Sequence, residues 1–259
     1  MKSNLYLICI CSILIFSSCN RYYYKPNAVN APLFTEGGQG HINLAGSFGG
    51  VNKDFDGNTH FFDVQGAVSP VNHLGIIANY STYAYRPDEP DIASGNVKGK
   101  AHIIESGIGG YYAKGKKFKM VVDGYVGYGA GKIDSDVDMR VHRFFFQPGI
   151  GVRSPWFDAA FNLRISNVKY IDFNANGRDN DYLVGKNLIN SEGKRIDDGS
   201  YTFMEPAFTI RAGYKFAKVQ FQMVLAEETN NVEWHYNAAR FSAGIYFSIE
   251  EAIEKANSK

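Results

Sequence analysis

The sequence predicts an all-β fold, an up-and-down antiparallel transmembrane β-barrel of ten strands, with eight strands as the alternative. Two observations lead to this prediction. Long runs of the chain alternate apolar and polar side chains with a period of two, which is typical of strands whose two faces meet different surroundings. Tight turns also alternate with longer, acidic loops along the chain, as in bacterial barrels with short turns on one rim.

The clearest unit is a hairpin at residues 140–170. One face of its first strand carries His142, Phe144, Phe146, Pro148, Ile150 and Val152, and the other carries Arg143, Phe145, Gln147, Gly149, Gly151 and Arg153. After a turn at 154–156, the apolar face continues with Ala159, Phe161, Leu163 and Ile165, and the polar face with Asp158, Asn162, Arg164 and Ser166. An apolar face opposite a charged one suits a barrel wall between lipid and lumen.

Eight further runs have one apolar face each. They cover residues 41–48, 60–68, 74–85, 101–113, 118–130, 201–214, 219–225 and 240–249. The tight connections are 69–72, 114–117, 154–156 and 215–217, and the longer ones lie around Asp54, Asp88, Asp134, 174–200 and Asn230. An even strand count places both ends of the barrel on the side of the short turns, which we expect to be periplasmic. Removing two edge runs would leave eight strands.

The N-terminus has the features of a lipoprotein signal in the usual order. Lys2 precedes an apolar run at 5–16, which is too short to span a bilayer as a helix. Ser17 and Ser18 then precede Cys19, and this order resembles the bacterial lipoprotein signal, in which the cysteine is acylated and becomes the first residue. Phe16 stands where that signal usually has Leu. We therefore predict a signal peptide at 1–18 and a fatty acid such as palmitate on Cys19, with an ordinary secretory signal as the alternative.

Pro26 and Pro32 exclude a regular helix or a central strand from residues 20–34, so we expect a linker or plug there. The predicted boundaries are a lipidated periplasmic tether at 19–39, a barrel at 40–249 and a short tail at 250–259. The stretch YKPNAVNAPLF at 24–34 resembles the segment after the lipidated cysteine in small outer-membrane β-barrel lipoproteins of Bacteroidota. That resemblance implies an outer-membrane location, with the N-terminus anchored in the periplasmic leaflet, and it implies no activity.

Charged residues of inward parity predict a network inside the barrel. The set comprises Glu105, Asp123, Arg143, Arg153, Arg164, Glu205 and Arg211. Side chains largely fill a narrow barrel, and an isolated buried charge is costly, so these charges must pair. Glu205 shares its face with the uncharged Phe203 and Ala207, so its partner must come from another strand. We predict a structural ion-pair network that plugs the lumen; a polar path for a small solute and a catalytic carboxylate cluster are the alternatives.

Two further features could bind metal. Residues 172–177 resemble the first half of an EF-hand calcium loop, but Leu183 stands where the bidentate Glu should be, and turn chemistry explains the stretch equally well. The histidines His60, His102, His142 and His235 have outward parity on alternate strands. Such residues lie at least about 9–10 Å apart, too far to share one zinc ion. We expect them among lipid headgroups, and we predict no metal or cofactor.

Composition narrows the function classes. Lys and Arg number 27 against 26 Asp and Glu, which argues against a nucleic-acid partner. No convergent nucleophile, histidine and acid are visible, so we expect no enzymatic activity. The first hypothesis is a structural outer-membrane lipoprotein, in contact with outer-membrane lipid and lipopolysaccharide, or a subunit of an envelope protein complex. A narrow porin-like or solute-binding barrel and an outer-membrane hydrolase are the alternatives.

Overall fold

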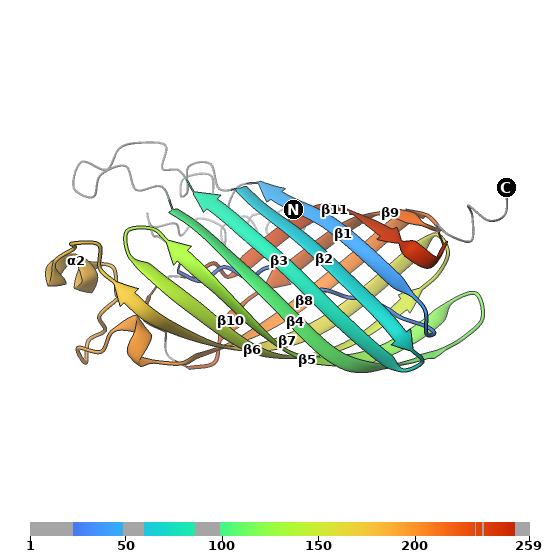
Figure 1. Cartoon of the computed structure of the whole chain (residues 1–259), viewed down its shortest axis with the longest axis horizontal. Coiled ribbons are helices and arrows are strands. Elements are labelled where there is room, and N and C mark those ends of the chain that lie inside the picture. The colour runs from blue at the N-terminus through green and yellow to red at the C-terminus, as the bar shows by residue number, and fades with distance from the viewer. Residues whose placement is uncertain (1–22, 49–59, 86–98, 231, 235, 252–259) are drawn as a thin grey trace, which may run out of the picture.

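Ten antiparallel strands close into a barrel in the computed structural model, which describes residues 23–48, 60–85, 99–230, 232–234 and 236–251 (Figure 1). The strands are β1 (Gly40–Phe48), β2 (His60–Val71), β3 (Leu74–Tyr85), β4 (Gly99–Lys114), β5 (Lys119–Asp134), β6 (Asp138–Arg153), β7 (Phe157–Asn174), β8 (Tyr201–Tyr214), β9 (Ala217–Leu225) and β11 (Ala239–Ser248). Each strand pairs with the next along the chain, and β11 pairs with β1 to close the barrel. The predicted all-β, up-and-down antiparallel barrel and its number of strands are confirmed, and the eight-strand alternative is wrong.

The period-two pattern has the expected cause. In β6, the outward Phe144 and Phe146 are exposed, whereas Arg143 and Phe145, which alternate with them, are buried. The short β10 (Glu227–Glu228) pairs with the end of β8 beyond the stretch that β8 shares with β9. Among the described residues, no helix is both long and apolar enough to cross a membrane.

The connections differ from the prediction at one place. We expected a longer loop around Asp134, but β5 and β6 are joined by residues 135–137 alone, and Asp134 pairs with Asp138. The turn closes because the backbone N–H of Ser135 donates to Asp138 Oδ1 at 3.3 Å. The predicted loops around Asp54 and Asp88 lie outside the described residues.

The two ends of the barrel have different connections. The connection from β7 to β8 carries α2 (Asn180–Gly185) and the 3₁₀ helix η1 (Ile196–Asp198), and it marks what we call the loop-side end. The opposite, turn-side end has the short connections at 72–73, 115–118, 154–156 and 215–216. In Figure 1 the loop-side end is on the left and the β4–β5 turn projects on the right.

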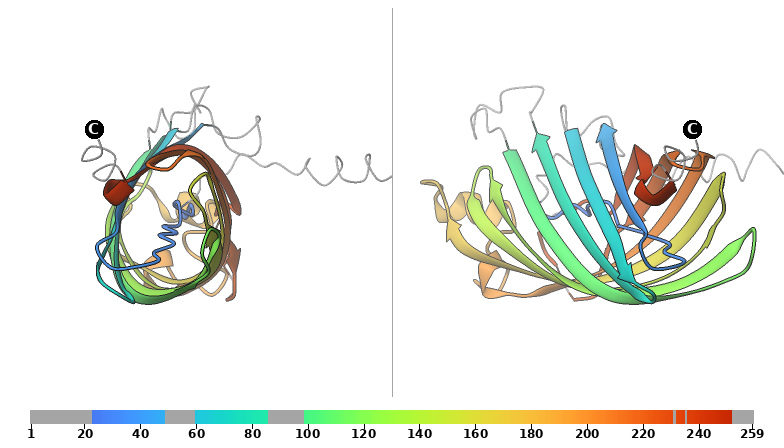
Figure 2. Two further views of the ribbon diagram at one scale, coloured as in Figure 1. Left: turned by 90° about the vertical axis from the view of Figure 1, so that its right-hand side faces the viewer. Right: turned by 45° about the vertical axis from the view of Figure 1, so that its right-hand side comes forward.

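The segment before β1 lies inside the barrel, so of the linker and the plug that the sequence left open, the described part forms a plug and not the predicted periplasmic tether. Every residue from Tyr23 to Phe34 is buried, and the dark blue chain runs within the ring of strands in Figure 2. We call residues 23–34 the plug. Eight strands enclose a lumen that side chains just fill, so ten strands leave room for an extended peptide.

Glycines in the wall make room for large inward side chains. A Cβ on Gly127 would lie 2.3 Å from the ring of Phe145, and one on Gly109 would lie 2.6 Å from the ring of Tyr125. Both rings therefore lie flat over neighbouring strands inside the lumen. These glycines therefore have a packing role in the barrel wall.

Candidate functional site

The middle of the lumen holds four of the predicted charges in one group, which we call the central cluster: Glu105, Arg143, Arg164 and Glu205. Arg143 lies 3.0 Å from Glu105, and Arg164 lies 3.7 Å from Glu105 and 2.5 Å from Glu205. Arg164 of β7 is directly opposite Glu205 of β8, so the partner of Glu205 does come from another strand. Two cations and two anions balance each other where no residue is more than 3% exposed.

The plug is bonded to every member of the central cluster. The Asn27 amide donates to Glu105 at 2.5 Å, and its carbonyl oxygen accepts from Arg143 at 2.6 Å and from Arg164 at 2.8 Å. The Tyr24 hydroxyl donates to Glu205, and so does the Ser166 hydroxyl at 2.8 Å. These bonds satisfy donors and acceptors that ion pairing alone would leave open, as a buried charge requires.

Lumen side chains also bond to the backbone of the plug. Gln65 donates to the Ala28 carbonyl at 3.0 Å, Gln222 to Val29 at 2.8 Å, Gln147 to Asn30 at 2.7 Å, Arg211 to Ala31 at 2.7 Å and Arg240 to Pro26 at 3.3 Å. The Val29 N–H donates back to Gln222 at 2.8 Å. An extended peptide without ladder bonds is tolerated in a barrel interior only if the surrounding protein supplies such partners.

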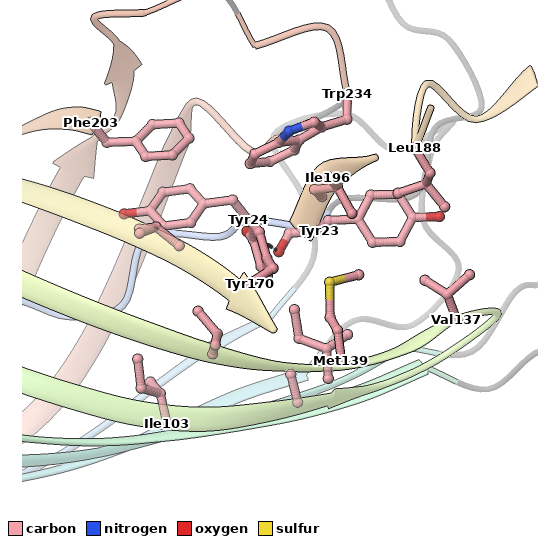
Figure 3. Close-up of a cluster of buried hydrophobic side chains, with 14 of the residues drawn as sticks. Tyr23, Tyr24, Ile103, Val137, Met139, Tyr170, Leu188, Ile196, Phe203 and Trp234 are labelled. Carbon is pink, nitrogen blue, oxygen red and sulfur yellow. Dashed lines mark hydrogen bonds between the residues drawn. The ribbon is translucent and has the colours of Figure 1, made fainter. Parts of the chain in front are cut away.

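An aromatic cap covers the loop-side end of the plug (Figure 3). The Tyr24 ring stacks on Phe203 at 3.9 Å, and Trp234 packs edge-on against Tyr170 at 5.6 Å. Leu188 and Ile196 of the β7–β8 connection complete the buried group. The long loop therefore folds inward over the barrel mouth.

A second group of charges lies at the other end, and we call it the turn-side cluster: Arg153, Asp158, Arg211, Lys218, Glu250 and Glu251. Arg153 bonds to Glu250 at 2.7 Å and lies 3.4 Å from Glu251. Asp158 accepts from Lys218 at 2.8 Å and lies 3.9 Å from Arg211. An open cavity of about 200 Å³ adjoins this cluster and is lined by Arg153, Glu250, Glu251, Lys116 and Lys117 among others.

The two glutamates of this cluster differ in their acidity. Burial alone would raise the pKa of Glu250, but the guanidinium of Arg153 lowers it by more, so it lies below its usual value of 4.5. Burial raises the pKa of Glu251, and Arg153 offsets this only in part. Glu250 is therefore the main anionic partner of Arg153.

Asp123 belongs to neither cluster. It is 6% exposed, and neither carboxylate oxygen has a hydrogen-bond partner among the described residues. Its Oδ1 and the Asn162 amide meet over Gly149, where a Cβ would lie 2.3 Å and 2.1 Å from them. The structure thus places all seven predicted charges in the lumen but leaves this one unpaired.

Sequence reasoning missed two ion pairs. Asp63 of β2 bonds to Arg240 of β11, and Asp158 bonds to Lys218. The acids of the predicted network were Glu105, Asp123 and Glu205, although Asp158 was placed on the polar face of its strand. Asp63 has the same parity as the inward Phe61 and Gln65, so that signal was present in the sequence.

The structure describes three of the four histidines and all of residues 172–177, the two features that could bind metal. His60 and His102 are exposed on the outer wall, and the half-buried His142 bonds to the Tyr128 hydroxyl, while His235 and Cys19 lie outside the described residues. Asp172 bonds to Arg140. The Asn176 N–H donates to Asn174 Oδ1 at 3.0 Å, which is turn chemistry. The described part of the chain contains no group of three or more His, Cys, Asp or Glu side chains that could hold a metal ion.

No protein-family model matches this chain, and no curated protein is significantly similar to it.

Proposed function

We propose that this chain is an outer-membrane β-barrel lipoprotein with a closed lumen, acting as a structural element or as a subunit of an envelope complex. The observation that carries the proposal is the apolar outer wall. Large apolar side chains are exposed on all ten barrel strands, including Leu44, Phe62, Ile76, Ile108, Val126, Phe146, Phe161, Phe208, Phe221 and Phe241. A continuous belt of this kind in water would drive aggregation, whereas lipid solvates it.

The height of this belt fits a bilayer. On β4 it extends from Ile104 to Tyr112, which are each 61% exposed. Eight residues at about 3.3 Å each, tilted by about 40°, give a height of roughly 20 Å, close to the ~25 Å band of outer-membrane barrels. Aromatic pairs flank the belt, with Trp156 against Tyr214 at 5.1 Å on the turn side and Tyr128 against His142 at 5.7 Å towards the loop side.

The filled interior favours the structural role over a solute path. The plug crosses the lumen and its polar groups are bonded to the wall, so the charges stabilise the closed barrel. A structural lipoprotein of this kind would be surrounded by outer-membrane lipid. A stable partner protein would bind to its loops or to its outer wall.

Fractionation and fatty-acid labelling test the proposal together. We expect the wild-type chain to sediment with outer membranes, to require detergent for extraction, to shift on gels after heating and to incorporate a clickable fatty acid that Cys19→Ala does not. A detergent-free soluble monomer, or label that persists on Cys19→Ala, would contradict it. Co-purification in mild detergent can then identify a partner protein. In single-channel recording we expect no conductance, and a steady open conductance would favour the porin-like alternative.

A further inference from the structure

The plug has a direction. Its first residue lies at the loop-side end, where the Tyr23 hydroxyl donates to Asp136 at 2.8 Å and its carbonyl accepts from Tyr170 at 3.0 Å. The chain leaves the plug at the other end, where Lys119 donates to Thr35 at 3.1 Å and the Gly37 N–H donates to Asn72 at 2.6 Å. The chain therefore crosses the whole lumen from loop side to turn side before β1 begins.

The strand count alone gives the opposite expectation for the N-terminus. Gly40 at the start of β1 pairs with Val68, and β11 ends at Ser248 beside it, so both ends of the barrel are on the turn side. An anchor just ahead of β1 would share that side. The plug reverses this, because it carries the chain back through the lumen to the loop-side mouth.

Chain length then limits where Cys19 can lie. Cys19 is four positions before Tyr23, and a fully extended chain covers at most about 3.6 Å per position, or about 14 Å in all. The wall is much taller: β6 has 16 residues, and at about 3.3 Å each with a tilt of about 40° it spans roughly 40 Å. Cys19 cannot reach the turn-side rim while the plug is in place.

We propose that the acyl chains of Cys19 enter the leaflet at the loop-side end of the barrel, the end at which the β7–β8 connection lies. This inference rests on the proposed function, since it needs a lipidated barrel in a membrane. It excludes one combination that the sequence suggested, long loops outside the cell with an anchor in the periplasmic leaflet. Either the anchor is in the outer leaflet with the loops, or the loops are periplasmic with the anchor.

The plug also connects the lipid anchor mechanically to the barrel wall. Tension on the anchor would pull on Tyr24 and Asn27, which are bonded to the central cluster on β4, β6, β7 and β8. Moving the anchor to the turn side would require withdrawing the plug and leaving these charges without their partners. The end of the barrel at which the anchor lies is thus fixed by the same contacts that close the lumen.

Cysteine labelling of acylated protein tests the inference. Single substitutions Arg21→Cys, Ser191→Cys and Lys116→Cys are made, and reaction with an impermeant maleimide is compared in intact and lysed cells, reading only the band that carries a clickable fatty acid. We expect Arg21→Cys to follow Ser191→Cys, and Lys116→Cys to show the opposite pattern. The comparison is relative, so it holds whichever rim faces the outside.

A result in which Arg21→Cys follows Lys116→Cys would overturn the inference and leave the lipoprotein proposal intact. Absence of fatty-acid label on the wild type would contradict the proposed function, and the inference with it. Spin labels at the same positions give a second reading in detergent that does not depend on cell integrity. The distance from 21 to 191 should be shorter than that from 21 to 116, and the reverse order would refute the direction of the plug.

Discussion

The central cluster and the turn-side cluster use the same residue types in different surroundings. In the centre, Arg164 and Glu205 are fully buried, and every charge is bonded to another charge and to the plug. At the turn side, the Glu250 and Glu251 side chains that pair with Arg153 are 19% and 22% exposed, and an open cavity adjoins them. Water can therefore replace a lost partner of Arg153, but it has little access to the centre or to the Asp158–Lys218 pair, whose side chains are each 2% exposed.

This difference separates two kinds of charge pair. Removing one partner of a buried pair costs about 3–5 kcal/mol, because the other charge is left without compensation. Pairs that water can reach contribute about 0–1 kcal/mol. We therefore expect substitutions in the central cluster to have large effects on the stability of the plugged barrel, and substitutions of Glu250 or Glu251 to have small ones.

The largest effect is expected for Glu205→Gln. The substitution keeps the shape but removes the anion that accepts from Arg164, Tyr24 and Ser166. We expect a loss of about 3–5 kcal/mol, seen as a large drop in the temperature at which the heat-modifiable gel shift is lost. The matched control is Phe208→Leu, three residues along the same strand on the exposed outer wall. Equal, small effects from both would mean that the centre is hydrated.

A smaller loss is expected for Asn27→Ala, which changes the plug and leaves the wall intact. The amide of Asn27 bonds to Glu105, Arg143 and Arg164. Hydrogen bonds to charged groups contribute about 1.5–3 kcal/mol each, and the remaining ion pairs retain part of this. We expect a fall in the same transition temperature that lies between those of Glu205→Gln and Phe208→Leu. An unchanged temperature would show that the plug does not stabilise the cluster.

A still smaller, pH-dependent effect is expected for Glu250→Gln. Because Arg153 holds the pKa of Glu250 below 4.5, the stability from this pair is fully present above that pH and is lost as the pH falls through the lower, folded pKa. Wild type and variant should differ by about 0.5–1 kcal/mol at pH 7 and converge as the pH falls below the folded pKa of Glu250. The exposed Glu192→Gln serves as the control. A difference that persists in acid would assign the effect to packing instead.

The smallest effect, and one of opposite sign, is expected for Asp123→Asn. Neither oxygen of this carboxylate has a hydrogen-bond partner among the described residues, so no bond is lost. Removing a buried charge without a partner relieves a desolvation cost, and we expect the unfolding temperature to stay the same or rise. A fall comparable with that of Glu205→Gln would show that Asp123 has a partner in solution.

The barrel wall was predictable because its signals are local. Period-two alternation reports both faces of a strand at once, and hairpin connections need only neighbouring residues, so β3 and β8 have the predicted limits. The error in the loop predicted around Asp134 has a local cause as well. The pairing of β5 with β6 continues through charged residues, which are more typical of a loop. Inward parity also located the seven lumen charges, although it overlooked Asp63.

The plug was not predictable in the same way. Residues 23–34 have no periodicity that indicates their surroundings, and their bonds reach far along the chain. Tyr24 and Glu205 are 181 residues apart, and Asn27 and Arg164 are 137 apart. Pro26 and Pro32 excluded helix and central strand and left a linker or a plug as the possibilities, and only the closed barrel reveals that the segment fills a lumen too wide for wall side chains alone.

Cross-linking of the plug to the wall tests the central claim most directly. Val29 packs against Ala207 and Val224, which are opposite each other on β8 and β9. A short thiol cross-linker should join Val29→Cys to Ala207→Cys as readily as the wall control Ala207→Cys to Val224→Cys, and the outward Phe208→Cys should not react with Val29→Cys. That outcome places the plug in the lumen. Efficient cross-linking of the wall control without any Val29–Ala207 product would contradict the account.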